Sequence, residues 1–323
     1  MARILQQDDA LEAACRHLAA GEAVAMPTET VYGLAADATN GEAVARIFEA
    51  KGRPRFNPLI AHVADMEMAR RFAVFPPLAE RLAGAFWPGP LTLVLPQAEG
   101  SAIHPLATAG LDTVALRCPR GFARQAIARL GRPLAAPSAN VSGRISATTA
   151  EAVQAQLGTR IPLIVDGGPT PVGLESTIVK VAGETLTLLR PGGLAAEEIE
   201  RVAGRALVRG TTGVEAPGML ASHYAPSARL RLNVAQVEPG EALLAFGPRR
   251  ARGAETAVKV LNLSPAGDLR EAAANLFGHL AALDLGAAAV IAVEPVPASG
   301  LGEAINDRLA RAAAPRDTGG EKL

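Results

Sequence analysis

The chain has 323 residues, of which 49% are hydrophobic, and its formal net charge at pH 7 is zero. This length suits about two domains, and the apolar content is sufficient for a sizeable core. The neutral balance excludes a global basic field that would concentrate nucleic acid, and leaves room only for a local basic pocket.

Cysteine usage and the N-terminus indicate the compartment. Cys15 and Cys118 are the two cysteines, and neither belongs to a CxxC pair or suggests a disulfide framework. Asp8 and Asp9 precede the first apolar positions, which is unlike a signal peptide. No run of eighteen apolar residues occurs, so no membrane span is expected. We therefore expect a soluble cytoplasmic protein.

The first two hundred residues predict a mixed pattern of helices and strands. Asp8 and Asp9 open a helix that Gly21 closes, and a hairpin turns at Gly183-Glu184. The expected helices are 8–20, 41–51, 121–130 and 147–157. The expected strands are 23–26, 59–63, 91–95, 114–117, 133–136, 161–165, 176–181 and 185–189.

The pattern changes near residue 204. Residues 205–228 are rich in Gly, Pro, Thr and Ser and read as a linker. A small parallel α/β unit is expected after it, and the last eight residues are polar and expected to be frayed. Its strands are predicted at 229–234, 242–247, 257–263 and 288–293, and its helices at 268–285 and 300–313. The predicted domains are therefore 1–204, a linker at 205–228, and 229–323.

The familiar signatures of nucleotide and hydrolytic enzymes are missing from the sequence. It contains no GxxxxGK[ST] loop, no GxGxxG after a strand, no HExxH and no GxSxG. An enzyme that binds phosphate here must use side chains and turn amides.

The stretch from Lys51 to Asn57 is the best candidate for such a phosphate site. Lys51 offers a compact charge, Arg53 and Arg55 offer planar forks suited to phosphate oxygens, and Asn57 can bridge donors and acceptors. A solvated basic loop is the alternative. Two prolines make the stretch more rigid than solvation requires.

Polar residues also follow several predicted strands, where ligand groups collect in α/β sheets. Pro27–Gly33 carries Thr28, Thr30 and a carboxylate, although either threonine could instead cap a helix. His62 lies in an apolar strand and is either a core residue or a site residue. Arg117 ends another strand and requires an anion, which is either an aspartate or a ligand carboxylate.

Three more strand-end groups join this set. A turn runs from Pro137 to Asn140 and supplies a hydroxyl and an amide, with Ser146 close behind it. Glu175-Ser176-Thr177 begins one strand, and Arg190 ends the strand paired with it. Each signal is weak alone, but their joint occurrence favours a pocket for a phosphorylated ligand.

These motifs resemble, in order and spacing, the YrdC-like threonylcarbamoyl-AMP synthase family of tRNA modification. The resemblance covers about residues 5–200. The stretch Ala221–Pro226, followed by an α/β tail, is similar to the long two-domain form of the family. The matching segments are Pro27–Gly33, Lys51–Pro58, Phe86–Pro90, Val114–Arg117, Pro137–Gly143, Leu174–Ile178 and Leu189–Gly193.

The resemblance implies an α/β fold with a twisted mixed sheet and helices around a concave basic cavity, plus a Rossmann-like C-terminal domain. It also implies a nucleotidyltransferase that joins L-threonine, bicarbonate and ATP into threonylcarbamoyl-AMP and releases pyrophosphate. Mg²⁺ is expected with ATP, and no carboxylate pair in the sequence identifies its ligands. A threonylcarbamoyl-transferase complex is expected to receive the product for adenosine 37 of tRNA, with at most weak or transient tRNA contact and no membrane.

The resemblance further implies site residues. Lys51 and Arg53 are expected to drive catalysis by positioning and neutralising the phosphates. His62 is no more than a candidate general base. The residues expected at ATP are Lys51, Arg53, Asn57, Thr113, Ser138, Asn140, Ser146, Arg190 and Tyr224. The residues expected at threonine are Thr30, His62, Arg117, Ser176 and the backbone of Ala136.

Three other functions compete with this one. An RNA-binding module without chemistry is disfavoured by the zero net charge and the pocket-like hydroxyls and amides. A carbamoyl-transfer enzyme of the hydrogenase-maturation type would carry zinc-finger regions, and no CxxC pair occurs. A relative that lost the synthase activity is disfavoured because Lys51, Arg53, Ser138 and Asn140 are all present.

Overall fold

The computed structural model describes residues 1–210, 215–219, 222–286 and 288–315. They form two units: Met1–Ser142 with Ser146–Met219, and Gly143–Ile145 with Leu220–Leu323. The expected linker is thereby divided, because residues 215–219 belong to the first unit and residues 222–228 to the second. The last eight residues, for which fraying is expected, lie outside the described part of the chain.

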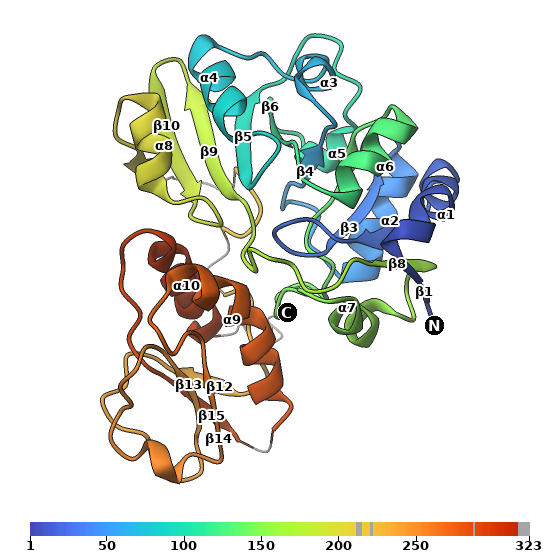
Figure 1. Cartoon of the computed structure of the whole chain (residues 1–323). Helices are drawn as coiled ribbons and strands as arrows, with labels where there is room; N and C mark the ends of the chain where they lie inside the picture. The colour runs from blue at the N-terminus through green and yellow to red at the C-terminus, as the bar shows by residue number, and fades with distance from the viewer. Residues whose placement is uncertain (211–214, 220–221, 287, 316–323) are drawn as a thin grey trace, which may run out of the picture. The chain divides into compact units, whose positions relative to one another are not determined.

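The described strands of the first unit form one mixed sheet (Figure 1). Their order is β1-β8-β2-β3-β7-β4-β6-β5-β9-β10-β11, which confirms the predicted α/β fold. The strands are β1 Arg3–Gln6, β2 Val24–Met26, β3 Gly33–Asp37, β4 Ile60–His62, β5 Leu91–Pro96, β6 Thr113–Arg117, β7 Leu134–Ala135, β8 Leu163–Asp166, β9 Thr177–Ala182, β10 Thr185–Arg190 and β11 Val208–Arg209.

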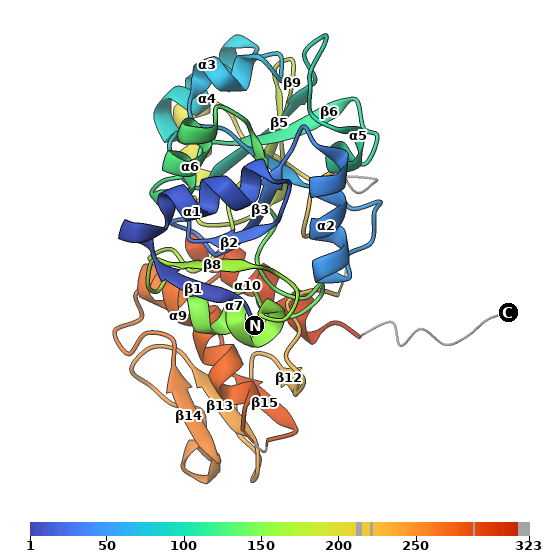
Figure 2. The same cartoon turned by 90° about the vertical axis from the view of Figure 1, so that its right-hand side faces the viewer.

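Helices cover this sheet, and α1 and α6 lie side by side on it (Figures 1 and 2). Helix α1 buries Ala10, Ala14 and Leu18, which are spaced four residues apart and so share one face. The helices of the first unit are α1 Gln7–Ala19, α2 Gly41–Lys51, α3 Met66–Arg70, α4 Pro77–Phe86, α5 Pro105–Thr108, α6 Phe122–Leu130, α7 Ala150–Leu157 and α8 Ala196–Ala203.

Helix α2 has the predicted bounds, and its two caps explain them. The side chain of Asn40 accepts hydrogen bonds from the amides of Glu42 and Ala43. Gly52 ends the helix in the left-handed region at φ 60°, which glycine adopts without steric cost. Lys51 is therefore the last helical residue, and the cationic loop begins directly after a rigid element.

Some predictions about local structure were wrong or incomplete. The helix expected over 147–157 begins at Ala150, because the Thr149 hydroxyl caps it by accepting from the amide of Ala152. Strand β3 was not predicted, since its sequence Gly-Leu-Ala-Ala-Asp has little β-propensity. Its pairing with β2 and β7 decides its structure.

The sheet topology brings four strand ends to one edge. Strands β4 and β6 are parallel, with His62 opposite Arg117. Strand β5 runs antiparallel to β6, and β9 runs parallel to β5. The ends of β4 and β6 therefore lie at the same edge as the beginnings of β5 and β9.

The second unit contains a parallel sheet, as predicted, and its strand order is β12-β15-β13-β14. Helices α9 and α10 contact one another and pack against this sheet (Figure 2). Its elements are β12 Arg229–Arg231, β13 Ala242–Ala245, the short 3₁₀ helix Ala254–Thr256, β14 Lys259–Asn262, α9 Leu269–Asp284, β15 Val290–Val293 and α10 Leu301–Ala313. Within the described ranges, no helix combines the length and hydropathy that crossing a membrane requires.

Candidate active site

Four buried polar side chains gather at this edge of the first unit's sheet. We call them the strand-edge cluster: His62, Thr92, Arg117 and Ser176. Two residues along the strand from each of them lies an apolar residue, and these four apolar residues belong to a small core cluster apart from the main core. They are Ile60, Val94, Ala115 and Ile178. Since alternate strand residues face the same side, the polar and apolar groups share one face of the sheet.

Residues 215–219 of the expected linker cover the apolar part of that face. Ala216 is fully buried against it, and Met219 packs beside Ala216. Arg190 Nη1 donates to the carbonyl oxygen of Pro217 at 3.2 Å, and Glu215 forms an ion pair with Lys180. Residues 215–219 are thus held to the first unit at both polar and apolar points.

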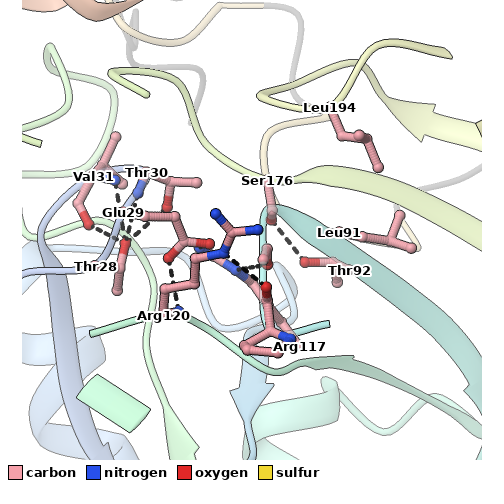
Figure 3. A network of polar contacts seen from close by, with 12 residues as sticks. Thr28, Glu29, Thr30, Val31, Leu91, Thr92, Arg117, Arg120, Ser176 and Leu194 are labelled. Atoms are coloured by element: carbon pink, nitrogen blue, oxygen red, sulfur yellow. Dashed lines mark hydrogen bonds and ion pairs between the residues drawn. The ribbon is translucent and has the colours of Figure 1, made fainter. Parts of the chain in front are cut away.

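Arg117 has a protein anion as its partner (Figure 3). Its Nη2 lies 2.8 Å from Glu29 Oε1, and the two side chains are 4% and 9% exposed. Neither atom has an aligned hydrogen-bond partner among the described residues, so both can still bond to a ligand. Sequence reasoning left an aspartate or a ligand carboxylate as the anion; the partner in the structure is a glutamate from the Pro27–Gly33 motif.

The hydroxyls of that motif form a turn (Figure 3). Thr28 Oγ1 donates to the carbonyl oxygen of Val31 at 2.7 Å and accepts from the amide of Thr30 at 3.2 Å. It also lies 2.8 Å from Thr30 Oγ1, which is completely buried. Strand β3 follows, so the alternative of a helix cap is wrong at this position.

Ser176 and Arg190 are joined at the same edge. Ser176 Oγ lies 2.7 Å from Thr92 Oγ1, and Arg190 Nη2 donates to the carbonyl oxygen of Ser176 at 2.8 Å. Arg190 is 4% exposed. The structure therefore places Arg190, which the resemblance assigned to the nucleotide, against the strand-edge cluster.

Lys51 organises the turn that begins at Pro137. Its Nζ donates to the carbonyl oxygens of Ser138 and Asn140, both at 2.5 Å, and its own carbonyl accepts from the amide of Ser142. Burial, with a smaller contribution from the charge of Arg53, holds the pKa of Lys51 well below its usual value. An arriving anion would favour the charged form again.

Arg53 and Asn57 belong to the loop that follows Lys51. Arg53 Nη2 donates to the carbonyl oxygen of Pro58 at 2.9 Å, and its Nε donates to that of Asn57 at 3.3 Å. The carboxamide of Asn57 is 1% exposed, and neither of its polar atoms has a partner in the described part of the chain. Buried polar atoms without a hydrogen-bond partner are rare in proteins, so we expect a ligand to bond to this carboxamide. Arg55 is exposed, so the three cations of the loop do not converge.

Three of the expected site residues remain: two for the nucleotide, Thr113 and Ser146, and one for threonine, the backbone of Ala136. Thr113 begins β6 and is half-buried, four residues before Arg117. Ser146 Oγ donates to Glu175 Oε1 at 2.5 Å, and both side chains are buried. The amide of Ala136 donates to the carbonyl oxygen of Ile60 at 3.0 Å, which fixes its backbone beside β4.

His62 is buried in its neutral form. Burial, assisted by the positive charge of Arg117, lowers the pKa of His62 to about 3. Its Nδ1 has no hydrogen-bond partner among the described residues. Such a histidine is a weak proton acceptor at neutral pH, which argues for a binding role and against general-base catalysis.

This burial predicts a pH-dependent stability. In the unfolded chain His62 gains a proton below about pH 6.5, whereas in the folded chain it stays neutral down to about pH 3. The contribution of neutral His62 to the free energy of unfolding is therefore complete above pH 6.5 and is lost as the pH falls toward 3. Between pH 7 and pH 5 we expect the free energy of unfolding to fall by about 1 to 2 kcal/mol more in the wild type than in His62→Gln. Urea unfolding followed by the fluorescence of Trp87, the single tryptophan, measures both slopes. Equal slopes would contradict the assignment.

A thiol lies directly after Arg117 in the chain. Cys118 Sγ donates to the carbonyl oxygen of Ala64 at 3.2 Å, and the residue is 2% exposed. Burial raises the pKa of the Cys118 thiol to about 11. The group is therefore protonated at neutral pH.

Tyr224 is the one candidate that lies outside the first unit. It belongs to the second unit, is 1% exposed, and stacks on Phe277 with ring centroids 5.6 Å apart.

Comparisons with known proteins identify the family of this chain. Residues 16–192 match a family model that is described as telomere recombination and that groups YrdC-type domains. Residues 194–314 match the model of the C-terminal domain of threonylcarbamoyl-AMP synthase. The chain belongs to the threonylcarbamoyl-AMP synthase family.

Relatives of this synthase family cover nearly the whole chain. The threonylcarbamoyl-AMP synthase of Pyrococcus abyssi is 42% identical over 315 residues, 90% of either chain. The Bacillus subtilis synthase is 42% identical over 327 residues, covering 96% of this chain and 94% of its own. A crystal structure of the Pyrococcus abyssi protein complexed with L-threonine matches with a TM-score of 0.85 at 40% identity, covering 94% of each chain.

Sequence reasoning missed two carboxylates at this candidate site. Glu29 pairs with Arg117, and Glu175 bonds to Ser146 and acts on the charge of Lys51. Each is an acidic residue in a segment that was already singled out. Both carboxylates are buried, and a carboxylate is rarely buried without a partner. Recognising that burial from the apolar residues around them would have marked both as site residues.

Proposed function

We propose that this chain forms threonylcarbamoyl-AMP by nucleotidyl transfer. The amine of L-threonine condenses with bicarbonate to a carbamate and releases water. A carbamate oxygen then bonds to the α-phosphorus of ATP, and the bond from that phosphorus to pyrophosphate breaks. The Arg117–Glu29 pair beside buried hydroxyls carries the proposal, since it complements a zwitterion that also bears a hydroxyl.

The strand-edge cluster suits threonine on grounds of charge. The pair of Arg117 and Glu29 is neutral as a whole, so a neutral zwitterion enters without leaving an unbalanced buried charge. Arg117 would take the carboxylate of threonine, and Glu29 would face its ammonium group. The residues that would complete the threonine site are Thr30, His62, Ser176 and the backbone of Ala136.

The nucleotide would lie next to the strand-edge cluster, at the turn that Lys51 holds. Ser146 bonds to Glu175, which directly precedes Ser176 of that cluster. Thr113 would contribute from the start of β6, about 13 Å from Arg117. Lys51 and Arg53 would neutralise the charge that develops on the phosphates. The side chains that would complete the ATP site are Asn57, Ser138, Asn140, Ser146, Arg190 and Tyr224.

Mg²⁺ would accompany ATP at Glu175. In nucleotide sites this ion is commonly held through one or two carboxylates and the substrate phosphates. Glu175 and its partner Ser146 fit that pattern. They also lie near Lys51, because the negative charge of Glu175 acts to raise the pKa of that lysine. Within the described ranges, no cluster of three or more potential protein ligands offers an alternative cage. The ion would supply charge neutralisation at the phosphates.

The product is an activated mixed anhydride and is consumed quickly by water. We expect a threonylcarbamoyl-transferase complex to receive it in the cytoplasm for transfer to tRNA, with at most transient tRNA contact by this chain.

Pyrophosphate release tests the proposed reaction. We expect release from ATP to require both L-threonine and bicarbonate, because the carbamate is the nucleophile. A coupled pyrophosphate assay measures it, with each substrate omitted in turn and with L-serine as a comparison that lacks the methyl group. Release that continues without threonine would refute the proposal.

A further inference from the structure

Tyr32 is the buried phenol of the Pro27–Gly33 motif, and the proposed reaction assigns it no role. Its side chain is 0% exposed, and burial raises the pKa of Tyr32 to about 12. The hydroxyl is therefore neutral at physiological pH and acts only through hydrogen bonds. A buried tyrosine needs partners for its hydroxyl, whereas a phenylalanine of the same shape would not.

The hydroxyl of Tyr32 bonds to two consecutive residues of one loop. It donates to the carbonyl oxygen of Gly168 at 2.8 Å and accepts from the amide of Gly167 at 3.1 Å. Both glycines belong to residues 167–172, which follow β8 and which we call the β8 loop. One side chain thus fixes the beginning of this loop through both a donor and an acceptor.

The β8 loop continues to Glu29, which would face the threonine ammonium group. The amide of Val172 donates to the carbonyl oxygen of Glu29 at 3.0 Å. The carboxylate of Glu29 in turn lies 2.8 Å from Arg117 Nη2 and accepts from the amide of Arg120 at 3.0 Å (Figure 3). The backbone position of Glu29 therefore depends on where the loop lies.

The β8 loop packs closely against the motif at its first residue and borders a cavity beyond it. A Cβ atom at Gly167 would lie 2.7 Å from Pro27 Cγ, so only glycine fits there. Further along, the loop up to residue 171 lines a cavity of about 200 Å³, together with residues 27–29. Hydrogen bonds therefore hold this part of the loop more than packing does.

The main chain of Tyr32 is fixed independently of its hydroxyl. Its amide donates to the carbonyl oxygen of Ala147 at 3.0 Å, and its carbonyl oxygen accepts from the amide of Ala139 at 2.7 Å. Each of these alanines is next in the chain to a proposed nucleotide residue, Ser146 or Ser138. Loss of the hydroxyl alone should therefore release the β8 loop and leave the nucleotide segments bonded.

We propose that Tyr32 is a positioning residue for the amino-acid substrate: its hydroxyl anchors the β8 loop, and the loop holds Glu29 where the carboxylate meets both Arg117 and the threonine ammonium group. This role rests on the proposed binding of threonine by the Arg117–Glu29 pair. Tyr32 acts on that pair through the loop.

Tyr32→Phe removes the hydroxyl and keeps the ring. In steady-state pyrophosphate release we expect the KM for L-threonine to rise about tenfold, while kcat and the KM for ATP each change less than about threefold. Hydrogen exchange of the free enzyme, followed by mass spectrometry, should accelerate in peptides that span residues 167–172 and not in those that span α2. A general loss of stability would raise exchange throughout the first unit and would not separate the two substrates.

Gly167→Ala disturbs the same loop with the phenol intact, because the new methyl group meets the ring of Pro27. It should also raise the KM for threonine. The double variant Tyr32→Phe/Gly167→Ala should lie within about twofold of the more affected single variant, as expected for two changes that act through one loop.

Ser264→Ala is the matched control for the loss of a buried hydroxyl. Ser264 is 0% exposed in the second unit, and its hydroxyl also has one partner of each kind: it donates to Glu271 and accepts from the amide of Asp268. This variant should keep the wild-type KM for threonine.

A wild-type KM for threonine in Tyr32→Phe overturns the positioning role, and so does an equal rise in the KM values for threonine and ATP. Unchanged exchange in residues 167–172, or effects that multiply in the double variant, would overturn it as well. If pyrophosphate release by the wild-type enzyme needs no threonine, the proposed function fails and the positioning role fails with it. Threonine-dependent release with a wild-type KM in Tyr32→Phe removes the positioning role alone.

Discussion

Lys51→Met should lower kcat/KM for ATP by about 10³, because it removes a buried cation from the proposed phosphate site. The same change deprives the carbonyl oxygens of Ser138 and Asn140 of their donor, so the turn that they form loses its fixed position. Leaving these carbonyls without a donor costs about 1 to 3 kcal/mol, which the fold should survive. Steady-state pyrophosphate release and the circular dichroism spectrum measure the two effects separately.

Lys259→Met is the control for loss of a lysine. Lys259 lies exposed on β14, and its Nζ donates to a single carbonyl oxygen, that of Ala282. This variant should keep wild-type activity. A folded Lys51→Met enzyme within about threefold of wild-type kcat/KM would show that the phosphates lie elsewhere.

Arg117→Met should destabilise the protein and abolish threonine-dependent activity. The substitution leaves the carboxylate of Glu29 buried without its counter-charge, at a cost of about 3 to 5 kcal/mol. The free energy of unfolding in urea and the dependence of pyrophosphate release on threonine measure the two losses.

The double variant Arg117→Met/Glu29→Gln separates structure from function. It removes both charges, so most of the lost stability should return. Activity should not return, because no guanidinium remains for the threonine carboxylate. Recovery of threonine-dependent release in the double variant, or no recovery of stability, would contradict the paired arrangement.

The sequence revealed the strands that carry the site but not the contacts across them. The bounds of α2 follow from local chemistry, since Asn40 and Gly52 act within one turn of the helix. Arg117 was recognised as a charge that needs an anion, again from its own strand. Its partner Glu29 lies 88 residues earlier and meets it only through the sheet, so no local pattern could reveal the pair.

The role of the expected linker was also hidden in the sequence. Its composition suggested a linker, because glycine, proline and small polar residues dominate it. Ala216 has no local pattern to mark it as a core residue, yet it is fully buried on the face that carries the site. The stacking of Tyr224 likewise depends on Phe277, which lies in a helix 53 residues further along the chain.

The buried thiol of Cys118, the residue after Arg117 in the chain, matters for the proposed chemistry. A carbamoyl adenylate is an acylating agent, and a thiolate is the nucleophile that it would modify most readily. With a pKa of about 11, about one molecule in 10⁴ carries the thiolate form at pH 7. The thiol of Cys118 would therefore resist acylation by the product of the proposed reaction.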